Sequence, residues 1–103
     1  MILFTKAILR KLPGLGETEK VPVEDKIVHL KLFGGSSFTY YCVEFDPVTG
    51  DMFGWTNGSW GYSNIHEISA VRFPPLNLQV ERDRGFRSQK FSAINDPMIA
   101  IMA

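Results

Sequence analysis

The sequence predicts an α+β fold, with a mainly antiparallel sheet built on a central hairpin and two short helices. Two segments rich in aromatic and β-branched residues, FTYYCVEF and MFGWT, flank the turn sequence DPVTGD at 46–51. Apolar residues near 5–12 and 63–71 instead recur at helical spacing. A chain of 103 residues can build one stable core but not two, so we expect a single domain over 1–103.

The first expected helix follows Thr5, a residue type that commonly caps helix N-termini. Its apolar period runs to Leu12. Pro13 and Gly14 end it, because the residue before a proline avoids the helical region and glycine accepts the left-handed one. Residues 14–25 combine glycine, proline and alternating charge without an apolar period, so we expect a loop there.

Apolar and polar residues alternate from Lys26, which predicts a half-buried strand before the hairpin. The hairpin itself covers residues 38–57 and closes through Asp46–Asp51, with Gly50 at positive φ. In a regular register one face carries Tyr41, Val43, Phe45 and Met52, and the other carries Phe38, Tyr40, Cys42, Phe53 and Trp55. Both faces are therefore apolar, and two short helices can cover only one of them.

The second half of the chain predicts shorter elements. NGSWGY at 57–62 indicates a turn or a bulged edge, and Ser63 or Asn64 caps a helix that ends before Pro74. LQVER at 78–82 predicts a late strand, which a basic loop follows. Residues 97–103 form an apolar tail too short to span a membrane. This tail either stays free or folds back over the second hairpin face.

Composition narrows the location and the class of partner. The formal net charge is zero and 45% of residues are apolar, which excludes a binder of polyanions whose whole surface is positive. The basic residues Arg72, Arg82, Arg84, Arg87 and Lys90 favour a solvated face, with a nucleic-acid patch as the alternative. A single cysteine indicates a reducing compartment, and no signal or membrane segment is recognised, so we expect a cytoplasmic protein without membrane contact.

The residues that carry chemistry give no catalytic or metal signature. Turn formation accounts for Asp46 and Asp51, and the two histidines and one cysteine lack the close spacing of a zinc site. Cys42 is typical of a buried thiol rather than a nucleophile paired with His66. The glycines do not form a phosphate-binding loop. We expect no catalytic residue, no metal and no cofactor.

A binding surface is the functional feature that the sequence does predict. For the charged stretch ERDR the sequence favours a self-paired ion network, and the functional alternative is that Arg82 or Arg84 stacks beside Trp55, Trp60 or Tyr62 to form an arginine and aromatic surface. The candidate binding residues are Tyr40, Phe53, Trp55, Trp60, Tyr62, Arg82 and Arg84. Such a surface suits a protein partner, a second copy of the chain or single-stranded nucleic acid.

Four stretches, taken in order, resemble a family of small bacterial proteins of unknown function that are carried largely on plasmids, phages and other mobile elements. They are TKAILRKLPGL, KLFGGSSFTYYCVEFDPVTGDMFGW, GYSNIHEISAVR and LQVERDRGF. The chain departs from the family pattern at Tyr40 and Tyr41, where a tryptophan is usual, and at NGSW, where a longer acidic stretch is usual. The resemblance implies a cytoplasmic accessory protein of mobile DNA, such as a gene-cassette product, and carries over no catalytic residue.

Two hypotheses about function follow. The first is a non-catalytic protein-interaction module that uses the aromatic hairpin face, and the sequence favours it. The alternative is a nucleic-acid-binding or processing factor, or a small enzyme that uses Glu44, His66, Glu81 or Asp83. A pocket that joins these acids to the histidine would favour the alternative, whereas an open aromatic face would favour the first.

Overall fold

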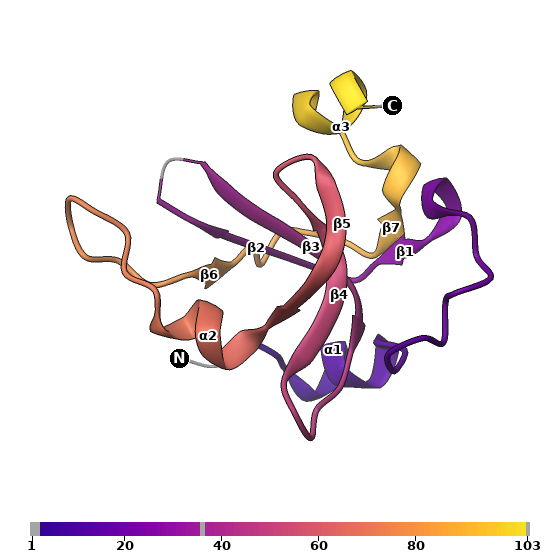
Figure 1. Ribbon diagram of the computed structural model, residues 1–103, viewed down its shortest axis with the longest axis horizontal. Coiled ribbons are helices and arrows are strands. Elements are labelled where there is room, and N and C mark those ends of the chain that lie inside the picture. Colours follow the sequence, from indigo (N-terminus) through magenta and orange to yellow (C-terminus); the bar gives the residue numbers. More distant parts are fainter. Residues whose placement is uncertain (1–2, 36, 103) are drawn as a thin grey trace.

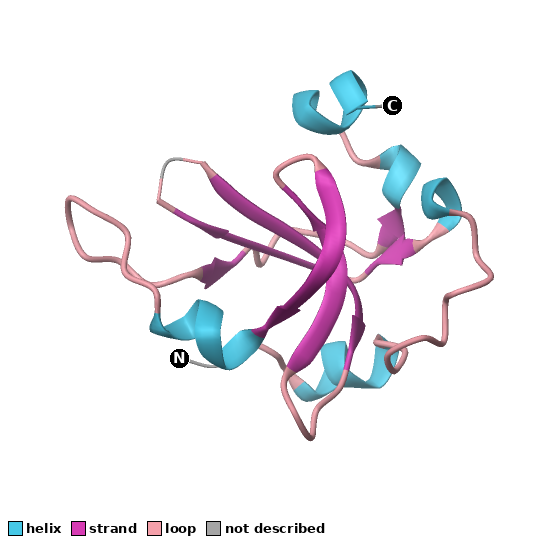
Figure 2. Ribbon diagram, in the orientation of Figure 1, coloured by secondary structure: helices cyan, strands magenta, loops and turns pink. Residues whose placement is uncertain are grey.

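The computed structural model describes residues 3–35 and 37–102 and has a sheet-dominated α+β architecture (Figures 1 and 2). One antiparallel sheet has five strands in the order β5-β4-β3-β2-β6, and a second pairs β1 with β7. The strands are β1 (Ile27–Val28), β2 (Leu30–Gly34), β3 (Phe38–Phe45), β4 (Asp51–Thr56), β5 (Ser59–Asn64), β6 (Glu81–Arg82) and β7 (Gln89–Lys90). The α-helices are α1 (Lys6–Lys11), α2 (Ile65–Ala70) and α3 (Pro97–Met102), and η1 (Val23–Asp25) and η2 (Phe91–Ala93) are 3₁₀ turns.

The mainly antiparallel α+β class agrees with the prediction, but the details of the helices and the late strand differ. The described residues contain three α-helices rather than two, because most of the apolar tail expected at 97–103 forms α3. The strand expected at 78–82 is limited to β6, with an isolated bridge between Phe73 and Leu78. Among the described residues, no helix is long and apolar enough to cross a bilayer.

Side-chain caps start the first two helices where the sequence indicated. Thr5 Oγ1 accepts a hydrogen bond of 3.2 Å from the backbone N–H of Ile8 at the start of α1. Asn64 Oδ1 accepts one of 2.8 Å from the N–H of His66 at the start of α2. Each cap satisfies an N–H group that has no partner within its helix.

The turn between β3 and β4 uses its aspartates for structure. Asp46 Oδ1 accepts a hydrogen bond of 2.9 Å from Val48 N–H, and Asp51 Oδ1 accepts one of 2.9 Å from the Asn64 amide. Gly50 has a φ of +83°, as predicted for this position. Both aspartates thus satisfy nearby hydrogen-bond donors, and the turn interpretation of this acidic stretch is confirmed.

A β-bulge shifts the register of β3 against β4. The predicted assignment of side chains to the two faces of the sheet is therefore wrong. Phe45 pairs with Met52, but the register then shifts between Cys42 and Glu44, so that Tyr41 pairs with Trp55. Gly54 lies at the bulge, where a Cβ would be 2.0 Å from the carbonyl oxygen of Tyr41. Such close backbone contact is a reason for glycine inside a strand.

Two clusters of buried side chains form on the two sheet faces. The helix-side cluster comprises Leu3, Leu30, Leu32, Tyr40, Cys42, Phe45, Met52, Ile65, Ile68 and Val80. The tail-side cluster comprises Val28, Tyr41, Val43, Trp55 and Ile99, with Trp60, Phe86, Phe91 and Ile94 packed against it. Ile99 of α3 is only 6% exposed, so the tail does fold back over the second face. The 3₁₀ turns η1 and η2 lie side by side below α3 in Figure 1, where η1 is purple and η2 is orange. They come from distant parts of the chain.

Glu44 ties the loop at 14–25 to the sheet. It is 2% exposed, and its carboxylate accepts hydrogen bonds from the N–H of Gly16 at 2.8 Å, the N–H of Thr18 at 3.0 Å and the Thr18 hydroxyl. Buried Lys26 donates to Thr18 Oγ1 at 3.1 Å and to the Thr18 carbonyl. The third carboxylate of the acidic stretch is therefore a structural acceptor.

Candidate functional site

An aromatic row crosses the tail-side face from β5 toward the C-terminal segment. The Phe53 ring stacks on Trp60 with centroids 5.6 Å apart and contacts Tyr62 at 5.0 Å. Phe91 of η2 continues the row, at 4.8 Å from Trp60 and 5.7 Å from Trp55. Tyr62 at the outer end is 71% exposed, whereas Trp55 at the inner end is buried. The row therefore runs from core to surface.

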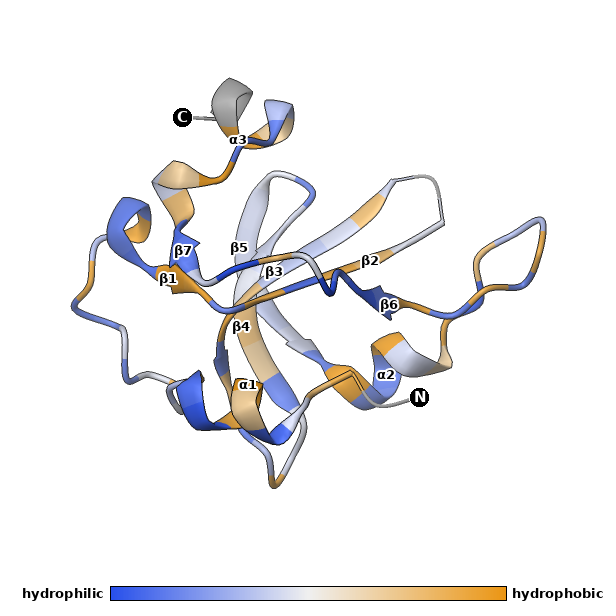
Figure 3. Cartoon of the chain, turned by 180° about the vertical axis from the view of Figure 1, so that it is seen from behind, coloured by the Kyte–Doolittle hydropathy of each residue, from blue (hydrophilic) through white to orange (hydrophobic). Residues whose placement is uncertain are grey.

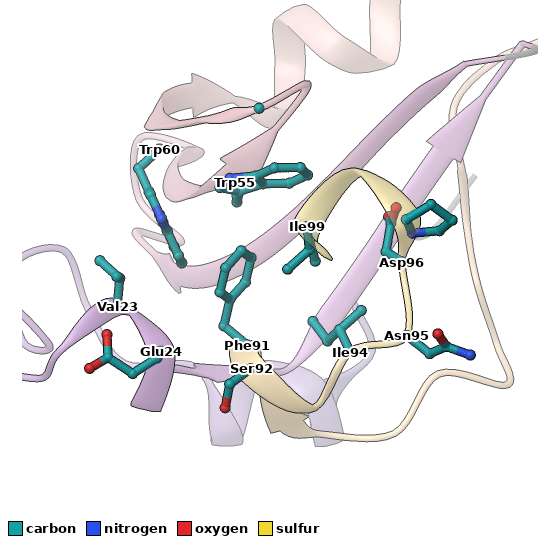
Figure 4. A pocket seen from close by; sticks show the side chains of 12 residues that line it. Val23, Glu24, Trp55, Trp60, Phe91, Ser92, Ile94, Asn95, Asp96 and Ile99 are labelled. Atoms are coloured by element: carbon teal, nitrogen blue, oxygen red, sulfur yellow. The ribbon is translucent and has the colours of Figure 1, made fainter. Parts of the chain in front are cut away.

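A pocket of about 610 Å³ opens beside the inner part of this row (Figure 4). Its apolar wall is formed by Trp55 of β4, Trp60 of β5, Phe91 of η2, Ile94 directly after η2, and Ile99 of α3. Val23 and Glu24 of η1 line the side next to Trp60 (Figure 4). The volume lies within the range of about 300–1,000 Å³ that is usual for ligand pockets, so the site can hold a sizeable apolar group.

The charged groups that line the pocket are acidic. Glu24 and Asp96 line it, and its described lining residues include no lysine, arginine or histidine. Asp96 is fixed in place, because Oδ1 accepts a hydrogen bond of 2.9 Å from Met98 N–H and Oδ2 accepts one from the Tyr41 hydroxyl. Burial, together with this hydrogen bond, raises the pKa of Tyr41. Carboxylates beside aromatic faces favour a ligand that carries a positive charge next to an apolar body.

Strand β5 forms one free edge of the five-stranded sheet, directly beside the pocket. Asn57 at φ +48° and Gly58 at φ +93° make a two-residue turn that sets Thr56 opposite Ser59. Backbone groups then alternate along β5, so those of Trp60 and Tyr62 point away from β4. Sheet edges are normally protected by charge, proline or a covering segment, yet the β5 sequence SWGYSN has neither charge nor proline.

The seven candidate binding residues of the sequence analysis do not form one surface. Phe53, Trp55, Trp60 and Tyr62 share the tail-side face, but Tyr40 is buried in the helix-side cluster, where its hydroxyl donates to the Gly61 carbonyl at 3.2 Å. The reason is the bulge, which turns Tyr40 away from Trp55. Arg82 and Arg84 instead line a separate cavity with Lys11, His29 and Arg87.

The two remaining basic residues of the expected patch lie elsewhere. Arg72 donates to the Ser69 carbonyl at 3.0 Å at the end of α2. Lys90 pairs with Asp25, with Nζ and Oδ1 3.5 Å apart. The five basic residues named from the sequence therefore do not make one continuous patch, and only three of them share a cavity.

The groups considered for catalysis are not assembled into a site. Glu44 is occupied by the loop at 14–25, whereas His66 and Glu81 are exposed on α2 and β6. Cys42 is fully buried, and burial raises the pKa of its thiol. In the part of the chain that the structure describes, no three His, Cys, Asp or Glu side chains are grouped to hold a metal ion.

No family model, curated protein or solved structure matches this chain. The site must therefore be interpreted from its own geometry. The sequence indicated Trp55 and Trp60 as binding residues, but not Phe91, Ile94, Ile99 and Asp96, which complete the pocket from the C-terminal segment. The only sequence signal for them was the surplus of apolar side chains after residue 90. The Asn57-Gly58 pair, a strong signal for a two-residue hairpin, could have identified the pairing of β5 with β4.

Proposed function

We propose that this protein is a non-catalytic interaction module that binds an extended segment of a partner protein along β5. One side chain of that segment would enter the pocket between Trp55 and Trp60. The observation that carries the proposal is the juxtaposition of an uncharged free sheet edge with a preformed apolar pocket. Trp60 belongs to both, since it is a β5 residue and a wall of the pocket.

Binding by strand addition explains why both features are needed. The outward N–H and C=O groups of Trp60 and Tyr62 would give main-chain hydrogen bonds that depend little on the partner's sequence. The pocket would supply specificity by accepting an aromatic or long aliphatic side chain. Tyr62, exposed at the end of the aromatic row, offers a second contact for an alternate side chain of the same strand.

The acidic side chains at the pocket set a further preference for the sequence of the bound segment. Glu24 and Asp96 at the pocket favour a lysine or arginine next to the apolar anchor residue. We therefore expect the bound segment to combine an apolar anchor with a neighbouring basic residue.

The biological setting of the proposal rests on the sequence resemblance alone. The order of the LP, EFDP, GY and ERD segments supports a cytoplasmic accessory protein of mobile genetic elements, such as a gene-cassette product. The partner would then be a protein of the host or of the element.

Selection from a displayed library of random peptides tests the proposal. We expect enriched peptides to share an apolar residue flanked by a basic one. The Trp60→Ala variant should bind them at least about tenfold more weakly, because tryptophan anchors dominate such interfaces. Phe33→Ala is the matched control, since Phe33 is a partly exposed aromatic residue on β2, away from the pocket. Equal loss of binding in both variants would contradict the proposal.

Self-association is the main competing use of the same edge. Two copies could pair β5 with β5, which would give a dimer whose edge is closed to other partners. Sedimentation of the full chain over a range of concentrations distinguishes the cases. A monomer leaves the edge open for a partner, whereas a stable dimer that Tyr62→Lys dissociates would replace the partner by a second copy.

A further inference from the structure

A second cavity, of about 160 Å³, lies where α1, β2 and the chain after β6 meet, and its lining is strongly basic. Lys11, Arg82, Arg84 and Arg87 contribute four cationic side chains, and His29 and Ser88 add further polar groups. The deep blue ribbon of β6 in Figure 3 marks the hydrophilic strand that supplies Arg82. These residues come from sequence positions as distant as 11 and 88, so the fold assembles a cluster that no single stretch contains.

The positive charge of this cavity exceeds its negative charge within the described part of the chain. Asp83 is its one acidic lining residue, and its carboxylate is directed to Lys31, at 3.9 Å, and to the N–H of Gly85, at 2.9 Å. The described ion pairs include none of the four cationic lining residues. Like charges held together in this way repel one another and favour an anion between them.

One unsatisfied donor, at Arg82, points to a bound acceptor. Arg82 Nε is buried and has no hydrogen-bond partner among the described residues, and the His29 ring Nδ1 lies 3.0 Å from Ser88 Oγ. A buried donor without an acceptor costs stability unless a ligand or water satisfies it. The cavity, of about 160 Å³, is large enough to admit a small ion.

We propose that this cavity binds a phosphate group, with Arg82, Arg84, Arg87 and Lys11 as its ligands. Guanidinium groups match the oxygens of phosphate in paired hydrogen bonds, and a doubly charged oxyanion balances the cluster better than a carboxylate. The group could belong to a free phosphate compound or to a nucleic-acid backbone, and both present the same oxygens to the site. The site lies on other elements than the aromatic pocket and does not depend on the function proposed for that pocket.

Titration of the full chain with inorganic phosphate, followed by amide NMR at constant ionic strength, tests the assignment. We expect saturable shifts at Lys11, His29 and Ser88, and no such shifts with chloride. The double variant Arg84→Gln/Arg87→Gln should lose at least about tenfold in affinity. Lys6→Gln/Lys20→Gln is the matched control, because it removes the same charge from exposed residues that do not line the cavity.

Further titrations identify the source of the phosphate. Binding of a nucleoside 5′-monophosphate as tight as that of inorganic phosphate indicates a terminal phosphate ligand. Preference for a single-stranded oligothymidylate, weakening steeply with salt, indicates a phosphodiester backbone. No saturable response to any of the three probes, or equal loss in the test and control variants, would overturn the proposal. Trp60→Ala should keep phosphate binding, so failure of one site leaves the other open to test.

Discussion

Gly50 occupies a backbone conformation and a space that do not accept a side chain. Its φ of +83° disfavours any side chain, and a Cβ there would lie 2.7 Å from His66 Cδ2. We predict that Gly50→Ala lowers the free energy of unfolding by about 1 kcal/mol or more, measured by urea denaturation. Gly61→Ala on β5 is the control, because nothing lies within 4 Å of its Cβ position and its φ is not positive. A Gly50→Ala variant as stable as Gly61→Ala would contradict the turn assignment.

Glu44 is the second residue that decides stability. Glu44→Gln places an amide among three donors and leaves the charge of neighbouring Lys26 less well balanced. We predict a loss of about 1–3 kcal/mol in unfolding free energy. Glu17→Gln makes the same change at an exposed site of the same loop, so its effect should stay within about 0.5 kcal/mol. Similar losses in the two variants would show that the buried network is not formed.

His29 makes the stability of the folded chain depend on pH. Burial, together with nearby Lys11, lowers the pKa of His29 below its ordinary value of 6.5. Between the folded and unfolded pKa values the unfolded chain therefore binds more protons, so stability falls as the pH drops below about 6.5. We predict that His29→Gln loses less stability than the wild type between about pH 7 and about pH 5.5, in buffers without phosphate. His66→Gln, at an exposed site, is the control, and a loss unchanged in His29→Gln would refute the prediction.

Among the elements, α3 has the most to do with the candidate site, because it closes both the tail-side cluster and the pocket. We predict that Ile99→Asp detaches α3, lowers stability and makes Trp55 more accessible to acrylamide quenching, since a charge cannot be buried there without a partner. Met98→Asp is the control, because Met98 is 49% exposed on the same helix. Equal quenching in the two variants would mean that α3 does not cover this face.

The sequence predicted those elements whose signals are local. Thr5 and Asn64 as caps, Pro13 as a helix stop and the turn at Asp46–Asp51 each act over a few residues, and the structure has them as expected. The bulge opposite Gly54 escaped prediction, because it depends on a backbone contact between two strands. One extra residue in β3 reversed the face of every side chain before it, which explains the misplacement of Tyr40.

The candidate site could be predicted only in part for the same reason. Trp55 and Trp60 were both expected on the aromatic surface, and the structure makes them cross-strand neighbours on β4 and β5. Phe91, Ile94 and Ile99 reach the pocket through the fold of the C-terminal segment, whose short apolar stretch has no strong period. Arg82 and Arg84 were expected beside the aromatic residues, but they line a cavity with Lys11 of α1 instead. This proximity depends on tertiary structure alone.

At the scale of the whole molecule, the two candidate binding sites follow from one topology. The covering segments from 14–28 and 86–99 protect the tail-side face but leave β5 open at the sheet edge. At the other edge of the sheet, β6 pairs with β2 over only two residues, and the chain after it turns to build the basic cavity with α1. Although the formal net charge is zero, an acidic pocket and a basic cavity form on different elements of the fold.

Residue-resolved amide exchange tests the central claim, binding along β5, most directly. In the free chain at low concentration, the amides of Trp60 and Tyr62 should exchange fast, whereas those of Ser59, Gly61 and Ser63 should be protected by pairing with β4. A bound peptide should slow Trp60 and Tyr62 selectively. If both amides stay fast in the complex while other regions become protected, or if they are already slow in the dilute free chain, the β5 edge is not the binding site.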